Sequence, residues 1–161
     1  MAIKQEGDRM VYDNIKFVLN TSGEAGIICV YKTATSGSSG NGESDLNEVL
    51  VPNPSASGSG TLSGLVAAGL LVNQVVSIDE SRYQLNEHKN EVRVGSPVHL
   101  LKKGGLFTNQ VSGTPKLGDT AYVTYDGKVA PTATHPNTPS VGVFGGVKDA
   151  NGYVMLYLDI K

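Results

Sequence analysis

The stretch Tyr-Val-Met-Leu-Tyr-Leu-Asp-Ile, residues 153–160, alternates aliphatic side chains with aromatic and polar ones. Because successive side chains of a strand point to opposite faces, this period of two predicts a β-strand with a buried aliphatic face. The opposite face carries Tyr153, Met155 and Tyr157, and we expect a loop or a neighbouring subunit to cover it. Tyr153 and Tyr157 are therefore the predicted subunit-interface residues.

Strand patterns separated by turn signals recur through the rest of the chain. Turn residues return about every 8–12 positions, and Asp126-Gly127 is a strong hairpin signal. Nothing supplies the repeated crossover helices of a parallel sheet. The sequence therefore predicts an all-β fold, a small antiparallel β-barrel or sandwich. The expected strands cover residues 9–12, 15–19, 26–31, 46–51, 75–78, 91–94, 98–101, 106–108, 120–125, 128–130, 141–147 and 153–160.

Residues 62–72 allow two interpretations. They are the best helix candidate in the chain, with Thr61 as the N-cap, although Gly64 and Gly69 weaken a helix. A buried irregular segment fits them equally well. Further along, the Lys-Lys-Gly-Gly stretch at 102–105 predicts a turn between two strands.

The chain of 161 residues has the length of one domain, within which the composition changes twice. Residues 1–8 read as a polar N-terminal arm. Residues 33–64 contain eight Ser and six Gly, and form either an exposed functional excursion or a plain flexible linker. Residues 73–161 form the β-rich core region.

Composition and motifs argue against several classes of function. A net charge of −2 is unsuited to a nucleic-acid binder that works through a basic surface. The single cysteine, Cys29, lies in a strand pattern and is expected to be a buried, inert thiol. His88, His99 and His135 show no metal-ligand spacing, and the apolar run at 65–72 is too short to span a membrane. We expect no enzyme activity, cofactor, metal, nucleic-acid partner or membrane partner.

Two charge features leave alternatives open. The acidic residues at turns are explained by local Asx-turn hydrogen bonding, although a glycosidase-like carboxylate pair stays an alternative. The basic residues gathered in 82–103 are either solvated strand faces or a docking face for an acidic protein partner. The acidic residues in question are Asp79, Glu80, Asp119, Asp126 and Asp149, and the basic ones are Arg82, His88, Lys89, Arg93, His99, Lys102 and Lys103.

A series of short patterns in the C-terminal half resembles the head decoration, or capsid cement, proteins of tailed bacteriophages. The order is a Gly-Asp-x-x-Tyr strand at 118–122, the Asp126-Gly127 turn, a Gly-Val-rich strand at 141–147 and a closing hydrophobic strand at 151–158. Residues 95–107 precede them with Gly-Ser-Pro-Val-His-Leu and Gly-Leu-Phe. The likeness covers about half of the chain, and the long Gly/Ser-rich excursion departs from compact members of the family.

The resemblance implies a β-tulip-like barrel and a structural role in the virion. Such proteins bind the outer surface of the assembled capsid, are frequently homotrimers, and often contact the shell through an N-terminal extension. Here the expected capsid-binding residues are Ala2, Ile3, Lys4 and Gln5. A polar arm of this kind can add to a sheet edge through its backbone. The implied partners are the major capsid protein and further copies of the chain, after synthesis in the bacterial cytoplasm without a signal peptide.

Two other classes of function stay open. A head-fibre or receptor- and carbohydrate-binding module could use exposed tyrosine rings for stacking, although the chain has no Trp. A small hydrolase would need a titratable pair in a cleft. The candidate stacking residues are Tyr12, Tyr31, Tyr83, Tyr122 and Tyr125.

Overall fold

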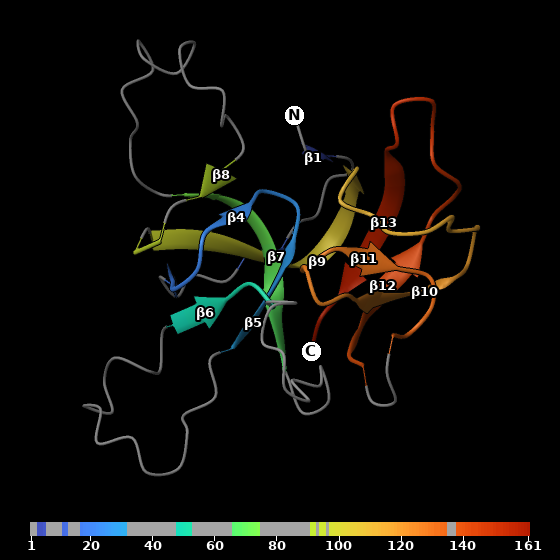
Figure 1. Ribbon diagram of the computed structural model, residues 1–161. Helices are drawn as coiled ribbons and strands as arrows, with labels where there is room; N and C mark the ends of the chain where they lie inside the picture. The colour runs from blue at the N-terminus through green and yellow to red at the C-terminus, as the bar shows by residue number, and fades with distance from the viewer. Residues whose placement is uncertain are drawn as a thin grey trace, which may run out of the picture.

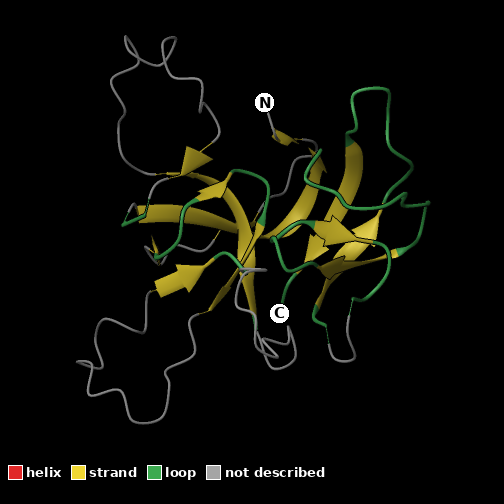
Figure 2. Ribbon diagram, viewed as in Figure 1, coloured by secondary structure: helices red, strands yellow, loops and turns green. Residues whose placement is uncertain are grey.

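The computed structural model describes residues 3–5, 11–12, 17–31, 48–52, 66–74, 91–92, 94–95, 97–134 and 138–161. These residues form strands joined by turns and bends, and none of them is helical (Figure 2). The predicted all-β barrel class is confirmed. The expected strand at 75–78 and most of the excursion at 33–64 lie outside the described residues.

Thirteen strands lie in the described part of the chain, eleven of them in one sheet, while β4 and β8 form a separate ribbon. They are β1 (Ile3–Gln5), β2 (Val11–Tyr12), β3 (Phe17–Leu19), β4 (Gly23–Glu24), β5 (Ile28–Tyr31), β6 (Glu48–Leu50), β7 (Ala67–Gln74), β8 (Glu91–Val92), β9 (Pro97–Thr108), β10 (Thr120–Val123), β11 (Val129–Ala130), β12 (Ser140–Phe144) and β13 (Val154–Asp159).

Strand β9 runs through the middle of the molecule and belongs to both of its halves (Figure 1). One edge of β9 pairs with β7 and then with β13, and the other edge pairs with β3, β2 and β1. The turn predicted at 102–105 is therefore wrong, because the chain continues as one strand through Gly104 and Gly105. Gly104 has a φ of +143°, and the buried face of β9 shifts by one residue between Leu101 and Leu106, which belong to the same hydrophobic cluster.

The N-terminal half is a closed five-stranded barrel in the order β9–β3–β6–β5–β7–β9. Closure gives each of these strands a partner on both edges, which satisfies the backbone hydrogen bonds. Its interior is a cluster of buried side chains that we call the barrel core: Phe17, Leu19, Ile27, Cys29, Val49, Ala68, Leu71, Val92, Val98 and Leu100.

Strand β7 corrects both interpretations of residues 62–72. Residues 67–74 pair with β5 and β9, and residues 61–65 lie outside the described chain. The apolar run is continuous because both faces are buried: Leu71 points into the barrel core, whereas Leu70 joins a second cluster. Gly69 allows β9 to approach closely, since a Cβ there would lie 2.7 Å from the Leu100 Cβ.

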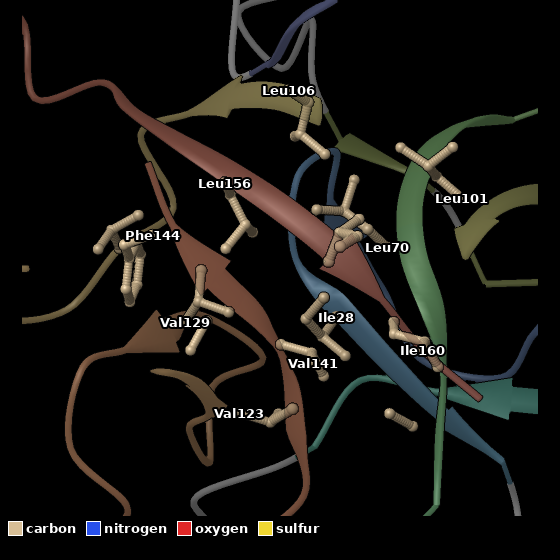
Figure 3. Close-up of a cluster of buried hydrophobic side chains, with 14 of the residues drawn as sticks. Ile28, Leu70, Leu101, Leu106, Val123, Val129, Val141, Phe144, Leu156 and Ile160 are labelled. Carbon is tan, nitrogen blue, oxygen red and sulfur yellow. The ribbon is translucent and has the colours of Figure 1, made fainter. Parts of the chain in front are cut away.

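The C-terminal half is a sheet in the order β11–β10–β12–β13–β9, which curls until Val111 bridges Val129 of β11. Its inner face packs against the outside of the barrel, and together they form what we call the shared core (Figure 3). Leu70 and Ile28 enter it from the barrel, and Phe144 and Leu156 enter it from the sheet. The two halves therefore bury apolar surface against each other.

Two local predictions are confirmed in this half, the buried face of β13 and the Asp126-Gly127 turn. Val154, Leu156 and Leu158 are buried, as the alternation in β13 predicted. The Asp126-Gly127 turn joins β10 to β11, and Gly127 has a φ of +76°. The turn at 149–152 precedes β13.

Candidate interaction surfaces

The exposed side of β13 lies in a mostly apolar strip of the sheet. Tyr157 is 50% exposed and pairs across the strands with Val143, which is 43% exposed. At the edge of β13 that faces β9, the half-buried Met155 lies opposite the half-buried Phe107 of β9. We call the surface made by Phe107, Val143, Met155 and Tyr157 the outer face.

Two glycines set the position of the Tyr157 ring. Gly105 is its cross-strand partner on β9, so no side chain stands opposite the tyrosine there. A Cβ on Gly145 would lie 2.8 Å from Tyr157 Cε2 and 3.0 Å from Met155 Cγ. The Tyr157 ring and the Cβ and Cγ atoms of Met155 therefore lie directly against the backbone at Gly145.

One ion pair borders the outer face beside Tyr157. Lys103 Nζ lies 2.8 Å from Asp159 Oδ1, and both side chains are more than half exposed. The hydrogen bond and the positive charge of Lys103 lower the pKa of the Asp159 carboxyl. Beside Tyr157 the surface thus carries a closed ion pair with no net charge.

Tyr153 lies at the turn before β13, away from the centre of the outer face. Its backbone N–H donates to Asp149 Oδ1 over 2.7 Å, and its carbonyl accepts from the Asp149 N–H over 2.7 Å. It lies four positions before Tyr157, a distance of about 13 Å along a strand. The two predicted interface tyrosines therefore mark different parts of the surface.

The expected N-terminal arm is, over residues 3–5, a strand of the chain's own sheet. β1 pairs antiparallel with residues 106–108 of β9, with Ile3 opposite Thr108, Lys4 opposite Phe107 and Gln5 opposite Leu106. Ala2 lies outside the described residues. Three of the four predicted capsid-binding residues are thus placed together at one edge of the C-terminal sheet.

Sequence reasoning did not single out the other apolar residues around β12. Leu117 is 76% exposed and Val147 is 70% exposed. Leu117 lies beside β12, because the N–H of Gly118 donates to the carbonyl of Phe144 over 2.9 Å. The missing information was the register, since Val143 and Phe107 become neighbours of β13 residues only once the strands are paired.

Within the described residues the structure shows little chemistry of other kinds. No group of three His, Cys, Asp or Glu there could hold a metal ion, and no described helix could span a membrane. Cys29 is buried, as predicted, and burial raises the pKa of its thiol to about 12.

The remaining sequence candidates are scattered or undescribed. The ring of Tyr31 makes an edge-to-face contact with Phe17, with ring centroids 5.8 Å apart. Its hydroxyl accepts a hydrogen bond from Lys102 Nζ over 3.1 Å. In the basic stretch at 82–103, His99 and Lys103 are exposed. The other candidates in these two sets that lie outside the described residues are Tyr83, Arg82, His88, Lys89 and Arg93.

The fold occurs in proteins of phage heads. No family model and no curated protein matches the sequence. The head fibre gp8.5 N base of bacteriophage phi29 superposes with a TM-score of 0.50 and 15% identity, over 95% of this chain and 97% of that one. A chain of the capsid of Myoviridae phage XM1 gives 0.53 and 11%, over 99% of this chain and 92% of that one. This agrees with the resemblance found in the sequence, and the chain shares its fold with components of a phage head fibre and a phage capsid.

Proposed function

We propose that the chain is a structural protein of a tailed-phage particle that binds the outer surface of the assembled capsid and stabilises it. The observation that carries the proposal is the fold likeness to two phage head proteins, which extends over nearly the whole of this chain. The order of the Gly-Asp, Asp-Gly and Gly-Val patterns along the sequence supports it independently.

The mechanism is adhesion without turnover, and the chain is not an enzyme. Contact with the shell is made by residues 2–5, of which 3–5 form the edge strand β1. Because only the assembled shell offers the site, binding of many copies stabilises that state by mass action. The major capsid protein is the partner in this scheme.

The outer face is the surface through which copies of the chain contact each other, as a homotrimer. Exposed aromatic and aliphatic side chains without net charge are typical of the centre of such interfaces. Tyr157 lies in the middle of this surface, between Val143 and Gly105, and Tyr153 lies toward its border.

The first experiment is co-sedimentation with undecorated, expanded capsids of the phage that encodes the chain. Saturable binding and a higher melting temperature of the decorated capsid are the expected results. Protein lacking residues 1–5 serves as the comparison, and its binding should collapse. Absence of binding by the full chain would refute the decoration function.

The subunit contact is tested separately by sedimentation equilibrium of the free protein. Tyr157→Asp places a charge in the centre of the outer face and should dissociate the oligomer. Val94→Asp is the matched control, since Val94 is 59% exposed in a turn beside the barrel. Dissociation by Val94→Asp but not by Tyr157→Asp would assign the contact to another surface.

A head-fibre base that presents a receptor- or carbohydrate-binding module is the second candidate. The observation that favours it is the likeness to the head fibre N base of phi29. Tyr122 and Tyr125 are half-buried and offer part of their surface for stacking. Specific signals on a glycan array, without any rise in capsid melting temperature, would favour this function over capsid stabilisation.

A further inference from the structure

The main sheet leaves very few strand edges open in the part of the chain that the structure describes. Residues in both halves have partners on both sides: Leu70 pairs with Ile28 and Leu101, and Leu156 pairs with Phe144 and Leu106. Even β11 is covered, by the bridge from Val111 to Val129. In the described chain, each strand of the barrel and of β10–β13 therefore has partners on both edges over at least part of its length, which leaves little room there for an added strand from another protein.

Among the strands that have one described partner, β1 is the best template. β2 and the ribbon β4–β8 offer only two residues per strand, and the pairing of β2 with β9 shifts register between Val11 and Tyr12. β1 pairs over three residues in unbroken register with β9, and its other edge has no partner in the described chain (Figure 1). The open edge thus lies at residues 3–5.

The sequence of β1 argues against a second copy of the chain as the occupant of this edge. A symmetric antiparallel pair centred on the strand would set Lys4 opposite Lys4 of the other copy. Like charges directly opposite each other destabilise a strand pair, and edge lysines prevent self-pairing in natural sheets. A strand with an acidic or uncharged residue at that position fits the edge.

We propose that β1 stays paired with β9 and that an extended strand of the capsid shell protein adds to the outer edge of β1, with an acidic or uncharged residue opposite Lys4. The inference rests on the proposed decoration function. Pairing with β9 already orders the strand, so binding does not have to meet the entropy cost of fixing a free arm. The shell strand then continues a ladder that runs through β1, β9 and β13.

The alternative is an arm that leaves β9 in order to bind the shell. Engineered disulfides between β1 and β9 distinguish the two mechanisms. Ile3→Cys with Thr108→Cys, and Lys4→Cys with Phe107→Cys, each join directly opposite residues of β1 and β9. Adjacent antiparallel pairs alternate between Cα separations of about 5.5 and 4.5 Å, both within reach of a disulfide. The buried Cys29, with its raised pKa, should not compete for oxidation.

Capsid binding is measured for the wild type, for the protein lacking residues 1–5, and for both locked variants before and after reduction. The proposal expects loss of binding on truncation and the same affinity for the oxidised and reduced forms of a locked variant that unfolds cooperatively. A loss of about tenfold or more on oxidation, regained on reduction, would show that the arm is released and overturn it. Full binding by the truncated protein would overturn it as well. No binding by the wild type would instead remove the decoration function itself, and this inference with it.

Discussion

At Gly142 the structure leaves no room for a side chain. A Cβ at this position would lie 1.9 Å from the carbonyl oxygen of Tyr157, and backbone cannot move aside as a flexible side chain can. We expect Gly142→Ala to lower the free energy of unfolding by at least about 2 kcal/mol, measured by urea denaturation. Gly146→Ala is the control, because its Cβ would meet nothing within 4 Å, and it should change stability by less than about 0.5 kcal/mol. Equal effects of the two changes would contradict this packing.

The buried thiol of Cys29 should make the free energy of unfolding depend on pH. Burial raises the thiol pKa from 9.0 to about 12 in the folded chain, so above pH 9 the unfolded state alone releases the proton. The folded protein keeps its full stability below pH 9 and should lose about 1.4 kcal/mol per pH unit between pH 9 and 12. Comparison with the pH dependence of Cys29→Ala isolates this contribution. Parallel curves for the two proteins would show that the thiol is not buried.

At the scale of an element, the turn of the β10–β11 hairpin hydrogen-bonds to and packs against strand β5 of the barrel. The N–H of Ile28 donates to the carbonyl of Gly127 over 2.7 Å, and a Cβ on Gly127 would lie 3.1 Å from the Ile28 carbonyl oxygen. Within the turn, Asp126 Oδ1 accepts a hydrogen bond from the Thr124 hydroxyl, and Asp126 Oδ2 lies 3.1 Å from Lys128 Nζ. The turn is thus both charged and packed against the barrel.

The Asp126 carboxylate should stabilise the hairpin at neutral pH and lose this effect in acid. Partial burial raises its pKa, but the hydrogen bonds from Thr124 and Lys128 outweigh this and hold the pKa below its ordinary 3.8. The stabilisation is therefore present above pH 3.8 and is lost as the pH falls through the lower folded value. We expect Asp126→Asn to be less stable than wild type at pH 7, with the difference shrinking below pH 3.8 in thermal unfolding. A difference that grows in acid would contradict this assignment.

At the scale of the whole molecule, the shared core should make the two halves unfold together. Leu70 and Leu71 are neighbours on β7 and are both fully buried, but Leu70 faces the shared core and Leu71 the barrel core. Each change to Ala should cost about 2–5 kcal/mol. In hydrogen exchange, both should raise the exchange rates of β13 amides as well as those of β5. If Leu71→Ala accelerated only the barrel, the halves would be independent units.

The sequence alone determined the elements whose signals are local. Alternation specified β13 and its buried face, Asp-Gly specified the hairpin, and the composition around Cys29 specified a buried thiol, because these depend on side-chain period, turn conformation and hydrophobicity. It also pointed to Tyr153 and Tyr157 as subunit-interface residues and, through the family resemblance, to residues 2–5 as capsid-binding residues. These two assignments remain predictions.

Only the tertiary structure decided which strands meet. Residues 62–72 and 102–105 carry the local signals of a helix and a turn, yet they lie in β7 and β9 because two cores and paired neighbours outweigh weak local preference. The same pairing brings Val143 and Phe107 beside β13, and within the described residues it leaves the outer edge of β1 without a partner. Cross-strand register joins residues far apart in the chain, so no pattern within a single segment could reveal the outer face or the open edge.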